Sequence, residues 1–277
     1  MFDLPLDRPD LYLVLCLKVV SVSCVIFSAE FLYLHREFRD GGLFSWRVRR
    51  ERAFFKRNAF CLPAADRILS YPAILFLIAI YGFLGLCNVF IFSTPDFLGV
   101  SCLLISAIGF LVRIRGNTGL SGSDQYVRVV LAAGGIALLS GSYYCIVAAL
   151  VFIAGQLTIH YMGGGWMRIQ HAAWRDGTYL TRVFGLHTYG RGMAHAIAVR
   201  FPEMARYASM SVLLFEVAFV LFYFLPPPTL YFVLAYIALF HVLVALVMGL
   251  NNFLWSFVGS FPAFIWVALK IQSLIYA

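Results

Sequence analysis

Long, uninterrupted apolar stretches constrain this chain more than any other feature of its sequence. About 20 apolar residues cross a bilayer as one helix, so 277 residues with several such stretches leave room for seven or eight crossings and no sizeable extramembrane domain. Charged residues make up only 12% of the chain, about half the fraction of a soluble domain. The stretches are continuous rather than alternating, which excludes an outer-membrane β-barrel. The sequence therefore predicts an all-α fold, a polytopic transmembrane helical bundle that forms a single membrane domain over residues 1–277.

The basic residues lie mainly in the loops between the apolar stretches. They give a net charge of +8, and positive charge beside membrane spans indicates contact with anionic lipid rather than with nucleic acid. Residues 35–71 contain nine Arg or Lys residues interleaved with aromatic ones. That mixture is typical of an interfacial segment at the headgroup level, although a solvated loop explains it equally well. Residues 166–206 form a second basic segment, which we expect to be amphipathic. Membrane lipids are the expected partners of both segments.

The apolar stretches predict seven spans directly. These cover residues 11–34, 72–91, a stretch that ends at Val112, 143–165, 207–225, 229–249 and 252–270. Residues 126–139 leave the count open between seven and eight. As a short crossing they would make eight spans and put three basic loops on one side, which the positive-inside rule favours. As a re-entrant or interfacial segment they would leave seven. Pro262 is expected to kink the last span.

Two ionisable residues are expected at similar depth in neighbouring spans. Glu216 lies ten residues before Pro226 and His241 thirteen residues after Pro228, which is about 15 and 20 Å along two antiparallel helices. A charge in the middle of a membrane is costly unless it has a partner. The sequence therefore predicts a hydrogen bond or ion pair between Glu216 and His241, either as a proton-handling dyad or as a lock between two helices.

A second polar set precedes this pair in the chain. Gln156 and His160 are four residues apart and project from one helix face. The glycines of Gly163–Gly165 let the chain unwind or approach another backbone closely. Either effect would bring Arg168 and Trp174 to the membrane interface.

We expect the two sets to meet. A polar pocket is predicted between the helix over residues 143–165 and the two helices that contain Glu216 and His241. The histidines of the chain show neither HxxxH nor HExxH spacing, so no metal site is expected in this pocket.

The order of several residues along the chain resembles one known family. These residues are Gly155-Gln156, Tyr161, Gly165, Arg168, Trp174, Gly177, Glu216, Phe240-His241, Phe253 and Pro262. Together with Phe38–Trp46, they resemble the transmembrane core of the vitamin K-dependent γ-carboxylase family and its bacterial relatives, the horizontally transferred transmembrane (HTTM) proteins. The resemblance covers roughly residues 10–270. It implies an integral protein of the bacterial cytoplasmic membrane, with a quinone-type cofactor, a small peptide substrate and a second protein subunit as partner.

One residue departs from the family pattern in a way that affects the chemistry. In the carboxylase a lysine serves as the base that starts quinol oxygenation, and its counterpart here is Arg168. A guanidinium is not deprotonated in proteins, so Arg168 cannot serve as that general base. This argues against γ-glutamyl carboxylation. Arg168 can still bind a carboxylate, a phosphate or a quinone oxygen through its fork of donors.

Two functional hypotheses remain open. In the first, the chain is an integral membrane enzyme, or the membrane subunit of one, that acts on a peptide or a lipid-soluble quinone. Its candidate catalytic residues are His241, Glu216, His160 and Arg168, and its candidate substrate-binding residues are Gln156, Tyr161 and Trp174. In the second, the chain is a non-catalytic partner in the maturation or export of a secreted peptide. A transporter is least favoured, because no internal repeat is visible.

Overall fold

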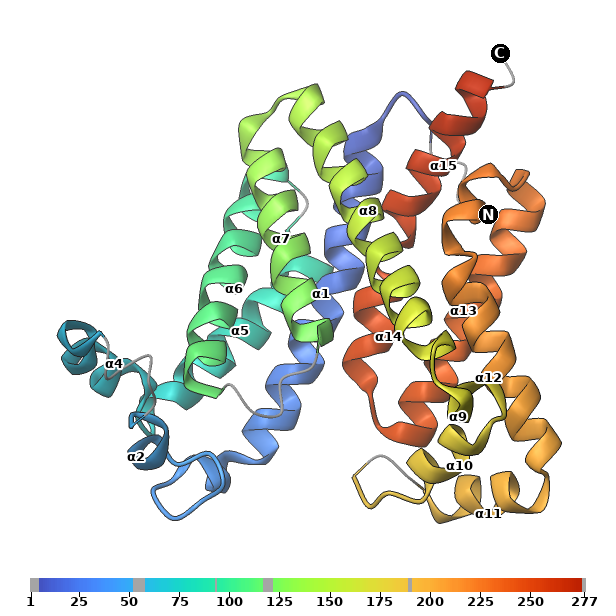
Figure 1. Cartoon of the computed structure of the whole chain (residues 1–277). Helices are drawn as coiled ribbons and strands as arrows, with labels where there is room; N and C mark the ends of the chain where they lie inside the picture. The colour runs from blue at the N-terminus through green and yellow to red at the C-terminus, as the bar shows by residue number, and fades with distance from the viewer. Residues whose placement is uncertain (1–4, 52–57, 93, 117–121, 189–190, 276–277) are drawn as a thin grey trace. The chain divides into compact units, whose positions relative to one another are not determined.

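The protein is all-helical in the ranges that its computed structural model describes, residues 5–51, 58–92, 94–116, 122–188 and 191–275. The helices divide into two compact units (Figure 1). Unit 1 comprises residues 1–12 and 150–277, and unit 2 comprises residues 13–149. That the whole chain acts as a single membrane domain stays a prediction.

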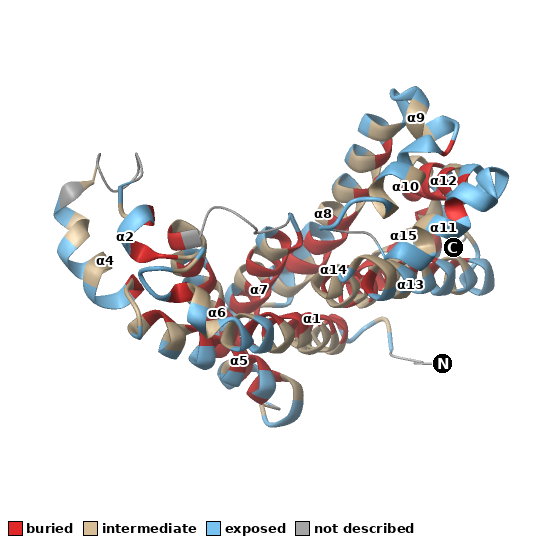
Figure 2. Cartoon of the chain, turned by 90° about the horizontal axis from the view of Figure 1, so that it is seen from below, coloured by how far each residue is buried: buried red, intermediate tan, exposed pale blue. Residues whose placement is uncertain are grey.

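Unit 2 is built on four long helices joined by short ones. The long helices are α1 (Pro9–Tyr33, whose first residues belong to unit 1), α5 (Ala73–Phe90), α6 (Pro95–Gly116) and α7 (Gly122–Ser140). Between α1 and α5 lie the short elements η1 (His35–Phe38), α2 (Trp46–Arg49), η2 (Ala59–Cys61) and α4 (Leu62–Leu69). Buried positions recur along α7 (Figure 2), because it packs closely against α6. The four short elements all lie in the basic segment over residues 35–71. Residues 52–57 of that segment lie outside the described ranges.

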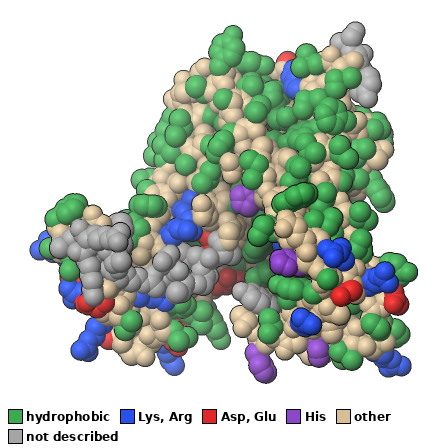
Figure 3. Space-filling view, viewed as in Figure 1, with side chains coloured by type: hydrophobic (Ala, Val, Ile, Leu, Met, Phe, Trp, Pro, Cys, Tyr) green, Lys and Arg blue, Asp and Glu red, His purple; other side chains and the backbone are tan. Residues whose placement is uncertain are grey.

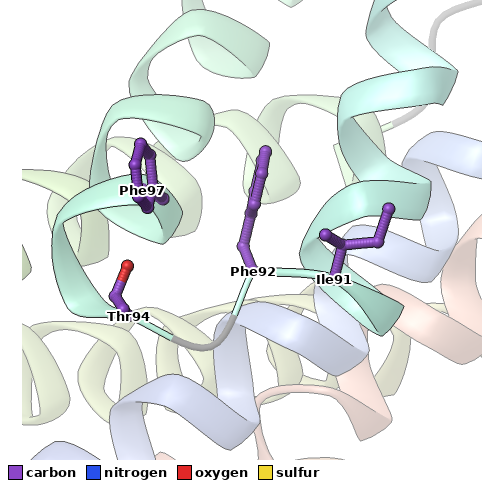
Figure 4. A pocket seen from close by; sticks show the side chains of 4 residues that line it. All are labelled: Ile91, Phe92, Thr94 and Phe97. Carbon is purple, nitrogen blue, oxygen red and sulfur yellow. The ribbon is translucent and has the colours of Figure 1, made fainter.

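A small apolar depression lies where α5 ends and α6 begins. Ile91, Phe92, Thr94 and Phe97 line a volume of about 320 Å³ there (Figure 4). None of these residues was predicted to take part in a site, and their side chains offer a ligand one hydroxyl and no charge. The depression therefore does not correspond to the polar pocket predicted from the sequence.

Unit 1 contains the residues that the sequence singles out for chemistry. Its elements are α8 (Tyr143–Ile169, from residue 150 onward), α9 (Ala172–Arg175), α10 (Thr178–Phe184), α11 (Gly192–Arg200), α12 (Pro202–Val217), η3 (Phe219–Phe224), α13 (Pro227–Met248), α14 (Asn251–Val258) and α15 (Phe261–Ile275). The short helices α9 and α10 pack against α12. The described residues of the segment 166–206, which are 166–188 and 191–206, thus form helices and turns of unit 1, while its amphipathic character stays a prediction.

Six helical stretches of the described chain are long and apolar enough to cross a membrane. They are Pro9–Tyr33, Ala73–Phe90, Pro95–Arg115, Tyr143–Ile169, Pro227–Met248 and Asn251–Ile275. Each corresponds to a predicted span. The last is interrupted between α14 and α15, directly before Pro262, as proline in a first helical turn favours.

The remaining two predicted spans are helical but are not among these six. Residues 126–139 lie in α7, which begins with a polar turn. Residues 207–225 are divided between α12, which has 16 residues, and η3. Neither α12 nor η3 alone reaches the roughly 20 residues that a crossing requires. The choice between seven and eight crossings depends on these two regions and stays a prediction.

The C-terminal end of η3 is bonded to two neighbouring helices of unit 1. Gln272 of α15 donates from Nε2 to the backbone oxygens of Tyr223 and Leu225, at 3.1 and 2.6 Å. The Tyr223 hydroxyl lies 2.9 Å from the Thr158 hydroxyl of α8. The two bonds from Gln272 satisfy carbonyl groups that the end of a helix leaves free, and the hydroxyl contact ties the same end to α8.

Candidate functional site

The helix α8 supplies four of the predicted site residues. It runs without a break through Gly163–Gly165 as far as Ile169, so the predicted unwinding at these glycines is wrong and the alternative, a close approach to another backbone, is correct. A Cβ on Gly165 would lie 2.8 Å from the Cβ of Glu216 and 3.0 Å from the backbone nitrogen of Val217. Only a residue without a side chain fits there. Helices α8 and α12 therefore cross at Gly165, and this crossing sets the position of Glu216.

This crossing makes a specific prediction for stability. Gly165→Ala is expected to lower the free energy of unfolding by about 1–3 kcal/mol, because the added methyl group forces the two helices apart. Thermal denaturation in detergent micelles, followed by tryptophan fluorescence, measures the change. Gly163→Ala is the matched control, since its Cβ would meet nothing within 4 Å and alanine is the better helix former. Equal effects of the two substitutions would contradict a tight crossing.

Next to this crossing, Arg168 and Glu216 form an ion pair. Arg168 Nη1 donates to Glu216 Oε1, and the Arg168 guanidinium carbon lies 5.1 Å from the centre of the Trp174 ring. The Glu216 side chain is 6% exposed, whereas that of Arg168 is 36% exposed. The buried carboxylate thus pairs with an arginine whose side chain remains partly exposed.

The second pair of the site joins α8 to α13. The Tyr161 hydroxyl lies 2.6 Å from Nε2 of His241, and both residues are buried. Phe257 of α14 stacks on the His241 ring, with centroids 5.2 Å apart and an angle of 9° between the planes. Phe219 stacks on Tyr161 at 4.4 Å. We call Phe219 and Phe257, together with Phe215, which packs edge-on against Tyr161, the aromatic box of the Tyr161–His241 pair.

Two buried polar atoms of the site have no hydrogen-bond partner among the described residues. They are Nδ1 of His241 and Oε2 of Glu216. Buried polar groups are hydrogen-bonded in the great majority of cases, and an exception calls for an explanation such as a ligand, a water molecule or a catalytic role. Both exceptions fall on residues that the sequence had already selected.

The predicted bond between Glu216 and His241 is wrong. Each of the two residues bonds to α8 instead: Glu216 to Arg168, and His241 to Tyr161. Arg168 and Tyr161 are seven residues apart, which is about 10.5 Å along a helix. The depth of the two side chains was therefore a poor guide to their partners, because it does not say which helix lies beside each one.

Gln156 and His160 are less buried than this pair. Both are half-exposed, and Nδ1 of His160 lies 2.8 Å from the backbone oxygen of Gln156, as expected for residues four apart on one helix. The His160 ring meets Phe257 edge-on at 5.9 Å. Phe257 is thus in contact with both His160 and His241. Sequence reasoning missed it, although its spacing of four from Phe253 placed both on one face of a helix.

The segment that follows α8 positions Trp174. Gly177 has a φ of +82°, and a Cβ there would meet the backbone of Arg206 in α12, so this turn requires glycine. The Ser209 hydroxyl of α12 donates to the backbone oxygen of Trp174. Asp176 accepts from the Thr178 N–H and hydroxyl at 2.9 and 2.7 Å, and these bonds lower the pKa of the Asp176 carboxyl. Charged and histidine side chains gather over this part of unit 1 (Figure 3).

Metal chemistry receives no specific support from the arrangement. In the described ranges, no group of three or more His, Cys, Asp or Glu side chains is arranged to hold a metal ion.

No protein-family model, curated protein or solved structure matches this chain. The geometry of the two pairs on α8, together with the residues that they contain, is therefore the basis for assigning a function.

Proposed function

We propose that this chain is an integral membrane enzyme of the HTTM type, in which the Tyr161–His241 pair moves a proton to or from a lipid-soluble substrate. Six long apolar helices support the membrane location. The order of Gly155-Gln156, Gly165, Trp174 and Phe240-His241 supports the family. The proposal extends to the bacterial cytoplasmic membrane and to seven or eight crossings, as the apolar stretches and loop charges favour.

The observation that carries this proposal is the pair of environments around the two ring nitrogens of His241. A neutral imidazole has one donor and one acceptor nitrogen. Tyr161 occupies Nε2 at 2.6 Å, while Nδ1 is buried without a partner in the described residues. If Nε2–H donates to the Tyr161 oxygen, Nδ1 is the acceptor. It can then take the proton of a substrate hydroxyl group, so that the O–H bond breaks and an N–H bond forms, and the Tyr161 oxygen stabilises the imidazolium.

The Arg168–Glu216 pair has a different role in this proposal. Arg168 would hold an anionic or carbonyl oxygen of the substrate through its accessible donors, while Glu216 keeps the guanidinium in place. Since arginine cannot act as a general base, we assign proton transfer to His241 and not to position 168. Gln156, His160 and Trp174 are candidates to orient the substrate. A quinol of the membrane is the substrate class that fits these groups, and a small peptide and a second subunit are the proposed partners.

The test compares strains rather than relying on a known substrate. The gene for this chain is deleted from its host, and the strain is then complemented with the unaltered protein or with Tyr161→Phe. Secreted peptides and membrane quinones are compared between these strains by mass spectrometry. Tyr161→Phe removes one hydroxyl group, and we expect it to lower the amount of the product by about tenfold or more.

Tyr223→Phe is the matched control, because it removes a buried tyrosine hydroxyl that bonds to Thr158 and not to His241. It should restore the product fully at an equal amount of protein in the membrane. Full activity of Tyr161→Phe would overturn proton transfer through this pair. In that case the second hypothesis, a non-catalytic partner in peptide maturation or export, would be favoured.

A further inference from the structure

Unit 2 contains a cluster of buried positive charge that shares no residue with the site above. Arg115, in the last turn of α6, is 2% exposed. Its Nε donates to the backbone oxygen of Leu69 at 2.8 Å, and its Nη2 donates to the backbone oxygen of Phe44. The guanidinium carbon lies 4.8 Å from the centre of the Phe38 ring. Three separate parts of unit 2 thus converge on one guanidinium.

A second buried arginine contacts the same loop. Arg49 of α2 is 7% exposed and donates from Nη2 to the backbone oxygen of Leu43 at 3.3 Å. Its guanidinium carbon lies 5.3 Å from the centre of the Phe44 ring. Two successive backbone carbonyls, those of Leu43 and Phe44, therefore accept from two different guanidinium groups. Two like charges are held close together in a buried place.

The charge of Arg115 is not neutralised by the described residues. No carboxylate among them forms an ion pair with Arg115, whose partners are two carbonyls and an aromatic ring. The stretches 52–57 and 117–121, which follow the two arginines closely in sequence, contain no Asp or Glu. A buried charge without a counter-charge is strongly unfavourable, so an anion from outside the chain is expected.

Two carboxylates of this region, those of Asp66 and Glu37, have partners of their own. Asp66 bonds to Trp46 at 2.7 Å and to Arg50 at 3.0 Å. The Glu37 carboxylate accepts from the backbone N–H of Leu43 at 3.0 Å. Neither of these carboxylates forms an ion pair with Arg115.

The fork of Arg115 indicates which kind of anion would fit here. Nε and Nη2 donate to carbonyls, whereas Nη1 forms no hydrogen bond to a described residue. Guanidinium groups match the geometry and charge of phosphate better than an ammonium group does. Leu43 and Val48, at 80% and 71% exposure, place apolar side chains beside this charge, as in a segment that meets lipid. We propose that a phosphate group, from a lipid headgroup or from solution, binds at Arg115 and Arg49.

The experiment uses the full-length protein, purified in detergent and stripped of lipid. Dioleoyl phosphatidylglycerol, dioleoyl phosphatidylcholine and inorganic phosphate are each titrated, and bound molecules are counted by native mass spectrometry. We expect one phosphatidylglycerol per chain to bind more tightly than phosphatidylcholine. Arg49→Gln should weaken this binding about tenfold. If inorganic phosphate binds in place of the lipid and Arg49→Gln abolishes that, the site is supported and its ligand is free phosphate.

Arg47→Gln is the matched control, since Arg47 lies in the same short helix as Arg49 but is exposed. The affinity of this variant for phosphatidylglycerol should equal that of the unaltered protein. Because Arg115 also holds three segments together, Arg115→Gln is expected to destabilise unit 2, so Arg115→Lys is used beside Arg49→Gln. Lysine keeps the charge and loses the fork, so we expect weaker phosphate binding and a lower melting temperature, with unit 2 still folded because one carbonyl hydrogen bond can be kept. The proposal would be overturned if the protein bound both lipids with equal affinity and if neither Arg49→Gln nor Arg115→Lys changed that affinity.

Discussion

His241→Phe is expected to reduce the activity by about 100-fold or more while leaving the fold intact, because it removes the group that handles the proton. Phenylalanine fills nearly the same space inside the aromatic box and can keep the stacking on Phe257, which now lies 5.2 Å away. The substitution loses one hydrogen bond to Tyr161 but also removes the buried Nδ1 that has no partner in the described residues. The lost hydrogen bond lowers the free energy of unfolding, and the removal of a buried nitrogen without a partner in the described residues raises it. The free energy of unfolding should therefore change by less than about 1 kcal/mol.

Two measurements test this result together. The product is measured in the restored strain, and the purified variant is denatured thermally. His187→Phe, the same change at an exposed position, should leave both unchanged. A loss of stability of about 3 kcal/mol or more with His241→Phe would mean that the histidine locks two helices together. Retained activity would mean that it does not transfer the proton.

Arg168→Leu is expected to have the largest effect on stability, because it leaves the Glu216 carboxylate buried without its counter-charge. Removing one partner of a buried ion pair costs about 3–5 kcal/mol. We expect the lower end of that range, since the Arg168 side chain is 36% exposed and the pair is therefore only partly buried. The double variant Arg168→Leu with Glu216→Leu should recover most of the loss, as apolar replacements of both partners often do.

Thermal or denaturant unfolding is measured for Arg168→Leu, for Glu216→Leu and for the double variant. The three changes in the free energy of unfolding give the coupling free energy between the two residues. Arg182→Leu is the control, because Arg182 is exposed and substitutions at such positions change stability by less than about 0.5 kcal/mol. If Arg168→Leu behaved like Arg182→Leu, the pair would be an ordinary surface contact.

The identity of several site residues could be predicted from sequence, but their pairing could not. Lipid makes isolated polar groups costly, so Glu216, His241 and Arg168 stood out without any coordinates. The same reasoning then joined Glu216 to His241, although each one bonds to α8. Gly165 was noticed as part of a triplet, yet only its closeness to Glu216 distinguishes it from Gly163. Phe257 and Arg115 were missed, because an aromatic or a basic residue at a helix end is unremarkable until its neighbours are known.

The sequence by itself determined that this chain is helical, that it contains several stretches long and apolar enough to cross a membrane, and which polar residues lie among them. Those properties depend on the local composition of about 20 consecutive residues. Only the tertiary structure decided that α12 gives way to η3 before residue 225, that Tyr161 bonds to His241, and that Arg168 bonds to Glu216. Hydrogen bonds and ion pairs act over about 3–4 Å, and residues 48 or 80 positions apart come that close only when their helices pack together.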